Sequence, residues 1–141
     1  MIQRIQSVWL LLAALCAAFT YKLAFYSGNK LGADNKTVFE KFTASSNFIL
    51  LITTAVLVAG CLYIIFLYKN RKQQLGLTIG ATALAVINLI IYFSETKKFL
   101  PNDSNYGLAA ALAVAIPVFL ILAARSIWKD EKLVKSVNRL R

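Results

Sequence analysis

The chain contains no histidine, only two cysteines and few charged residues. Without histidine, it cannot hold haem or zinc through imidazole, and it has no imidazole for acid–base catalysis. Glycine-rich phosphate-binding motifs are also absent. Charged residues make up 16% of the chain, against about 25% in an average soluble domain, and 59% of the residues are hydrophobic. These values disfavour a soluble globular domain. From the missing histidines and motifs, we expect no cofactor and no metal.

The two cysteines, Cys16 and Cys61, both lie inside long apolar segments. At about 1.5 Å per residue along a helix, they lie at different depths in a membrane. A disulfide needs Cα atoms within about 7 Å, so this difference disfavours a bond between them. No C-x-x-C pair is present, which excludes the membrane thiol oxidases that use one. We expect both cysteines to act as small buried hydrophobic residues.

Hydrophobic residues gather in four stretches instead of being dispersed. The stretches cover about residues 5–21, 48–68, 75–93 and 108–124. The last three contain no charged residue. Each approaches the roughly 20 residues that a helix needs to cross a bilayer, and none alternates as a barrel strand does. The sequence predicts an all-α membrane protein, with a four-transmembrane-helix bundle over residues 1–128 and a basic tail over 129–141.

Basic residues are distributed unevenly between the two ends of the predicted bundle. Ten of the 16 lie at the end that carries both termini and the 69–74 loop. They are Arg4, Lys69, Arg71, Lys72, Arg125, Lys129, Lys132, Lys135, Arg139 and Arg141. Because basic residues are enriched on the cytoplasmic side of membrane proteins, both termini are expected in the cytoplasm. The net charge of +10 reflects this topology, and we expect no nucleic-acid partner.

Small residues recur at four-residue spacing along the predicted helices. Gly76 and Gly80 form a G-x-x-x-G pair near the start of the third one. Such spacing lets two helices approach closely in lipid. One interpretation is packing within the bundle, and the other is a face that binds another subunit. Both glycines are therefore candidate partner-binding residues.

Asn88 is the strongest polar group within the apolar stretches. One interpretation is a hydrogen bond to a neighbouring helix, worth about 1 kcal/mol in a membrane. The alternative is a substrate contact or a pore constriction. We favour the hydrogen bond.

The first outer loop, residues 22–47, contains turn-forming residues between two segments rich in aromatic and apolar residues. Those segments are Lys22–Tyr26 and Thr37–Phe42, and they predict a short β-hairpin over the bundle. The alternative is a loop that lies on the membrane surface. Aromatic residues near this end are expected to act as interfacial anchors. They are Tyr21, Tyr26, Phe48, Tyr92, Phe93 and Tyr106.

The C-terminal tail has the pattern of a basic amphipathic helix that continues from the fourth stretch. Leu133, Val137 and Leu140 recur at helical spacing, and Glu131 precedes Lys135 by four residues in the favourable order. Such a helix binds anionic lipid or docks on a cytoplasmic protein. Its candidate partner-binding residues are Lys132, Leu133, Lys135, Val137, Arg139 and Leu140.

Both ends of the chain resemble the ends of one known family. The opening is MIQRIQS over Met1–Ser7, and the ending is R-x-I-x-K-D-E-x-L-V-x-S-x-x-R-L-R over Arg125–Arg141. These features are similar to an uncharacterised bacterial family of four-helix membrane proteins, family 4293 of the domains of unknown function. The resemblance implies a multi-pass protein of the bacterial inner (cytoplasmic) membrane and implies no activity. Asn138 departs from the family, which usually has an acidic residue there.

These features predict a non-catalytic membrane subunit or assembly factor. Its expected partners are the lipid bilayer and either another protein or further copies of this chain. The alternative is a small oligomeric transporter or channel, with Asn88 and a helix bend at Pro117 as its best candidates. A third hypothesis, an enzyme acting on lipid, has only Glu95, Asp103 and Cys61 as candidates, and sequence position does not bring these together. We expect no enzymatic activity.

Overall fold

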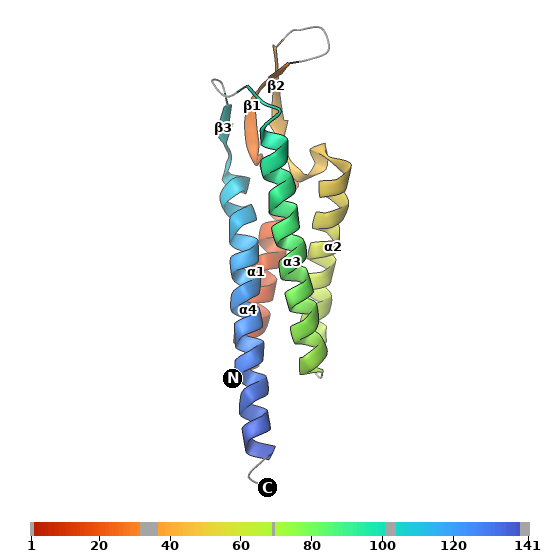
Figure 1. The fold of residues 1–141 in the computed structure, drawn as a ribbon, viewed down its shortest axis with the longest axis vertical. Helices are drawn as coiled ribbons and strands as arrows, with labels where there is room; N and C mark the ends of the chain where they lie inside the picture. Colours follow the sequence, from red (N-terminus) through yellow and green to blue (C-terminus); the bar gives the residue numbers. More distant parts are fainter. Residues whose placement is uncertain (1, 32–36, 69, 101–103, 139–141) are drawn as a thin grey trace.

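The computed structural model describes residues 2–31, 37–68, 70–100 and 104–138. Within these ranges, four α-helices lie side by side, and a small antiparallel sheet lies beyond one end of them (Figure 1). The helices are α1 (Ile2–Phe19), α2 (Phe48–Phe66), α3 (Arg71–Thr96) and α4 (Leu108–Asn138). Helix α1 begins and α4 ends away from the sheet, where α2 also turns into α3. We call the two ends of the molecule the sheet end and the turn end.

The helices pack around a core of small and branched apolar residues. Helix α1 contacts α2 and α4, and α3 contacts the same two helices from the other side. Ala13 and Ala17 of α1 are almost completely buried, so α1 approaches its neighbours closely. Cys61 belongs to this core, and both cysteines are free, as the sequence predicts.

The outward surfaces of the helices are apolar. Phe48, Phe66 and Ile90 are 75%, 77% and 61% exposed. Among the described residues, α2, α3 and α4 contain stretches long and apolar enough to cross a membrane. The apolar part of α1 is shorter and covers Ile5–Phe19. The predicted helical class is confirmed, and three of the four predicted spans correspond to helices of spanning length.

The helix ends differ from the ends of the apolar stretches. Helix α1 stops at Phe19, where the Thr20 hydroxyl donates to the Ala17 carbonyl. Helix α3 begins at Arg71, ahead of its apolar stretch, and α4 continues to Asn138 across the predicted boundary at residue 128. Apolar composition marks only the part of a helix that avoids water. Polar residues with good helix propensity extend the same helix beyond that part.

The hairpin predicted in the first long loop is present, but its first strand lies later than expected. Strand β1 (Tyr26–Leu31) pairs antiparallel with β2 (Thr37–Phe42). The expected strand over Lys22–Tyr26 is wrong, because the Lys22 and Leu23 amides still donate to the Phe19 carbonyl at the end of α1.

A third strand, β3 (Ser104–Tyr106), pairs with the other side of β1, so the strand order is β2-β1-β3. The sequence did not predict β3, because three residues without an alternating pattern give no strand signal. The Tyr26 hydroxyl hydrogen-bonds the Ser104 hydroxyl at 2.7 Å, which ties β1 to β3. A short 3-10 helix, η1 (Ala44–Ser46), joins β2 to α2, and the Asn47 side chain caps α2 by accepting from the Ile49 amide.

Aromatic side chains pack the sheet end of the chain against the helices. The Phe25 ring is fully buried and stacks on the Tyr92 ring of α3, with 4.4 Å between ring centroids. Phe42 meets Tyr92 edge-on at 5.9 Å, and Tyr26 meets Phe99 at 5.3 Å. The expectation that Tyr26 and Tyr92 are interfacial anchors is therefore wrong. The sheet covers both rings, and they belong to a second core at the sheet end.

Two segments of the chain pass close to each other at Gly107, between β3 and α4. The Gly107 amide donates to the Phe25 carbonyl at 2.9 Å, and the Ala109 amide donates to the Ala24 carbonyl at 3.3 Å. A Cβ atom on residue 107 would overlap the Ala24 carbonyl group. Only glycine therefore fits at this position without movement of the backbone.

We predict that Gly107→Ala destabilises the protein by about 1–3 kcal/mol, because the added methyl group must displace the Ala24 backbone. The measurement is the thermal unfolding temperature in mild detergent. Gly76→Ala is the matched control, since nothing lies within 4 Å of a Cβ atom at residue 76. Equal unfolding temperatures for the two variants would contradict the prediction.

Candidate partner-binding surfaces

An ion pair joins the start of α3 to α4 at the turn end. Arg71 Nη1 lies 3.2 Å from Asp130 Oδ2 and also donates to the Asp130 carbonyl oxygen at 3.3 Å. The Asp130 side chain is only 13% exposed. A guanidinium that binds both a carboxylate and a backbone carbonyl of one residue fixes position as well as charge. The pair therefore sets where α4 lies as it passes the start of α3.

Two buried glutamines add further connections near this ion pair. Gln6 of α1 donates to the Ser126 carbonyl of α4 at 3.3 Å. Gln74 of α3 donates to the Ile64 carbonyl of α2 at 3.2 Å. The Ile64 carbonyl, in the last turn of α2, also accepts from the Leu67 amide at 3.2 Å, so Gln74 is its second donor. Polar side chains thus join three pairs of helices at the turn end.

Helix α4 projects beyond the other helices at the turn end (Figure 1). Lys132, Leu133 and Val134 are exposed on this segment, and Lys132 Nζ lies 6.0 Å from the Trp128 ring centroid. The candidate residues Lys135 and Val137 belong to the same helix. The candidates Arg139 and Leu140 lie outside the described residues.

The candidate glycines Gly76 and Gly80 lie on the outward side of α3 and are exposed. Nothing lies within 4 Å of a Cβ atom built on either glycine. Their lack of side chains therefore serves no close approach among the described residues. Of the two interpretations given by the sequence, this placement favours a face that is open to another molecule.

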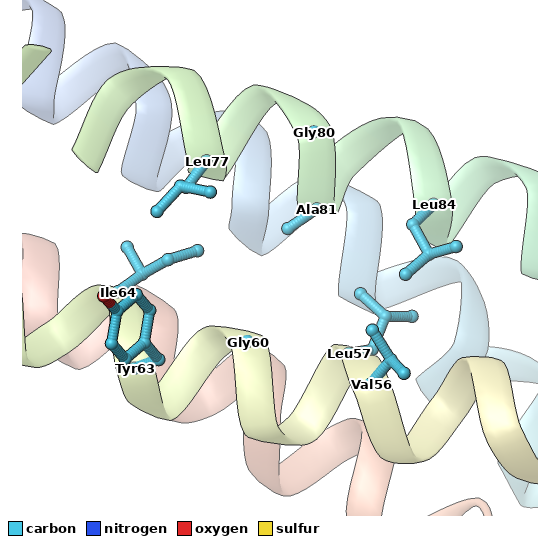
Figure 2. Close-up of a pocket in the computed structure, with 9 residues that line it drawn as sticks. All are labelled: Val56, Leu57, Gly60, Tyr63, Ile64, Leu77, Gly80, Ala81 and Leu84. Carbon is cyan, nitrogen blue, oxygen red and sulfur yellow. The ribbon is translucent and has the colours of Figure 1, made fainter. Parts of the chain in front are cut away.

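An apolar opening of about 230 Å³ lies in the seam between α2 and α3 (Figure 2). We call it the α2–α3 window. Its lining residues are Val56, Leu57, Gly60, Tyr63, Ile64, Leu77, Gly80, Ala81 and Leu84. Gly60 lies on the side of α2 that faces α3, with the short side chain of Ala81 across from it, while Gly80 lies farther from α2. The sequence does not predict this window, because Gly60 is not part of a glycine spacing pattern in α2.

Asn88 lies in α3 and is bound by two threonines of α2. The Thr53 hydroxyl donates to Asn88 Oδ1 at 3.1 Å, and Asn88 Nδ2 donates to the Thr54 hydroxyl at 3.0 Å. Asn88 is only 4% exposed. The amide thus makes hydrogen bonds between helices, which is the interpretation we favoured from the sequence.

The candidates for lipid chemistry lie apart. Glu95 pairs with Lys98 at the sheet end, with 2.7 Å between Nζ and Oε1, and Cys61 is buried in the helical core. Asp103 lies outside the described residues. Among the described residues, no three Cys, Asp or Glu side chains gather as a metal site would require.

We predict that Asn88→Leu lowers stability by about 1 kcal/mol, because both interhelical hydrogen bonds are lost. Thermal unfolding in mild detergent measures the change. Thr82→Val serves as the control, since the Thr82 hydroxyl donates only within its own helix, to the Thr78 carbonyl. An unfolding temperature of Asn88→Leu equal to that of the unaltered protein would show that these bonds do not hold α2 to α3.

We also predict that Asp130→Asn loosens α4 around the ion pair, at a cost of about 1–3 kcal/mol, because the Asp130 side chain is largely buried and Arg71 loses its charged partner. Hydrogen–deuterium exchange of the peptide over residues 127–134 should become faster. Glu95→Gln breaks an ion pair at the opposite end and should leave that peptide unchanged. Unaltered exchange in Asp130→Asn would refute the positioning role of the pair.

Comparison with known proteins gives one match. The model of a family described as a domain of unknown function, DUF4293, matches residues 2–140. No curated protein and no solved structure matches the chain.

Proposed function

The chain belongs to the DUF4293 family, and from this membership and its apolar helices we propose that it is a multi-pass protein of the bacterial inner membrane. Large apolar side chains such as Phe66 and Ile90 cover the outward surfaces of the helices, which supports a lipid environment. Helix α1 has 18 residues, about 27 Å in length, so a fourth span is consistent with its size.

The turn end is proposed to face the cytoplasm. Arg71, Lys72, Arg125, Lys129 and Lys132 all lie there, and basic residues are enriched on the cytoplasmic side of membrane proteins. The sheet then lies on the outer side, together with Lys97, Lys98 and Glu95.

Within this membrane, the proposed function is that of a non-catalytic subunit or assembly factor that binds a protein partner. The observation that carries it is the projection of α4 beyond the other helices at the basic end (Figure 1). The Arg71–Asp130 pair holds α4 at the level where α3 begins. From there to Asn138, the helix advances about 12 Å along its own axis, away from the proposed bilayer.

This geometry favours a protein over lipid as the partner of the projecting segment. A helix that binds a membrane surface lies in the interface plane, whereas α4 continues in the direction of its spanning part. Lys132, Leu133 and Val134 are exposed there, giving basic and apolar side chains side by side. The acidic Glu131 next to them also suits a protein surface better than an anionic bilayer. Gly76, on the outward face of α3, is a second candidate, for contact with a membrane helix.

The alternative function, an oligomeric transporter or channel, receives less support. Its best candidates were Asn88, as a polar group available to a substrate, and a bend at Pro117, which lies inside α4. Asn88 instead bonds Thr53 and Thr54.

The test is site-specific photo-crosslinking in native membranes. A crosslinker at residue 133 should capture one discrete protein. That protein should co-purify with the chain in stoichiometric amount. A chain shortened to end at Glu131 keeps the Arg71–Asp130 pair and should lose that partner while remaining in the membrane fraction. The expected loss is about tenfold or more in recovered complex, equivalent to at least about 1.4 kcal/mol.

The matched position for the crosslinker is Phe48, which is exposed at the sheet end. It should not capture the same protein. Recovery of an unchanged complex with the shortened chain would show that the projecting segment is not the binding surface. If the unaltered chain itself is absent from the membrane fraction, the proposed membrane location is refuted.

A further inference from the structure

The α2–α3 window is a gap in an otherwise continuous seam. Figure 2 shows Leu77 near Ile64 at one end of the window and Leu84 near Leu57 at the other. Leu57 and Ile64 are buried behind it. Between these ends, Gly60 and Gly80 contribute no side chain, and nothing lies within 4 Å of a Cβ atom at either position. The opening, of about 230 Å³, is large enough to accept part of a molecule from outside the chain.

The window has the chemistry of an acyl-chain site. Its lining is apolar apart from the hydroxyl of Tyr63, which is 61% exposed at the rim. From Leu77 to Leu84, the window runs for about 10 Å along α3. It opens outward, where the proposed bilayer places hydrocarbon chains.

The charge at the turn end selects the headgroup. Lys72 is exposed on α3, one helical turn before Gly76 and two turns before Gly80. The neighbouring Arg71 is already paired with Asp130, so Lys72 is the cation of this turn that faces outward. A second copy of this chain fits less well, because it would place its own basic end beside this one. An anionic headgroup is attracted by the same charge.

We propose that the α2–α3 window holds one acyl chain of an anionic phospholipid from the leaflet at the turn end, with the lipid phosphate at Lys72. The proposal rests on the membrane location given above. It does not depend on a protein partner of the projecting segment.

The experiment uses the full chain extracted from membranes in mild neutral detergent. Native mass spectrometry measures binding of phosphatidylglycerol and of phosphatidylcholine with the same acyl chains. The unaltered protein should hold one phosphatidylglycerol molecule in preference to phosphatidylcholine. Gly80→Leu and Gly60→Leu fill the window from opposite walls, and each should weaken that binding about tenfold.

Ala83→Leu is the matched control for bulk. Ala83 lies on the same helix but lines a separate groove against α4, together with Val86 and Ile121. It should leave phosphatidylglycerol binding unchanged. Circular dichroism and a single elution peak verify that each variant is folded, and having two window variants keeps the test decisive if one does not fold.

Charge is tested separately at Lys72. Lys72→Gln should reduce the preference for phosphatidylglycerol over phosphatidylcholine about fivefold. Lys97→Gln removes an exposed charge at the other end of α3 and should not change the preference.

Three results would overturn the proposal. The first is unchanged lipid binding in both window variants, and the second is equal binding of the two lipids by the unaltered protein. The third is a protein subunit, or a second copy of the chain, that is released specifically by Gly80→Leu. Each of these leaves the crosslinking test at residue 133 unaffected, so the failure of one proposal is distinguishable from the failure of the other.

Discussion

The stacking of Phe25 on Tyr92 is the contact on which the sheet end depends. The Phe25 ring packs against α3, its amide donates to Phe42 of β2 at 2.7 Å, and its carbonyl accepts from Gly107 ahead of α4. One residue thus joins a strand, a helix and a connecting turn. Because the ring is fully buried, the backbone around it cannot shift without exposing apolar surface. The position of the sheet, and of the first turn of α4, follows from this arrangement.

The sequence predicted the parts of the fold that depend on apolar composition. Long uncharged stretches identified the helices, and the aromatic segment over Thr37–Phe42 identified β2. Composition could not identify β1, because Gly28 and Asn29 have the character of a turn and become strand by pairing with β2 and, at Gly28, with β3. It could not show that Tyr92 is buried either. Tyrosine near a helix end is equally typical of a membrane interface and of a small aromatic core.

The candidate surfaces were less predictable from the sequence than the helices were. Spacing alone singles out Gly76 and Gly80, but only the structure shows that they are exposed and that Gly80 and Gly60 line one window. The Arg71–Asp130 pair joins residues far apart in the chain, and no local pattern connects them. One signal was available, since Asp130 is an acid within a strongly basic segment. An acid in such a place suggests a specific cationic partner.

Helix α4 has a mechanical consequence for the molecule. Its first turn is bound to the sheet through Gly107 and Ala109, and its far end passes Arg71 and continues outward. The helix is 31 residues long, about 46 Å, and a helix resists bending along its length. If the projecting end is displaced sideways, α4 tilts as a nearly straight rod, and β3, which is bound next to its first turn, tilts with it. Pro117 lies about a third of the way along α4 from its start and lacks an amide hydrogen, which makes it the point where this helix bends most easily.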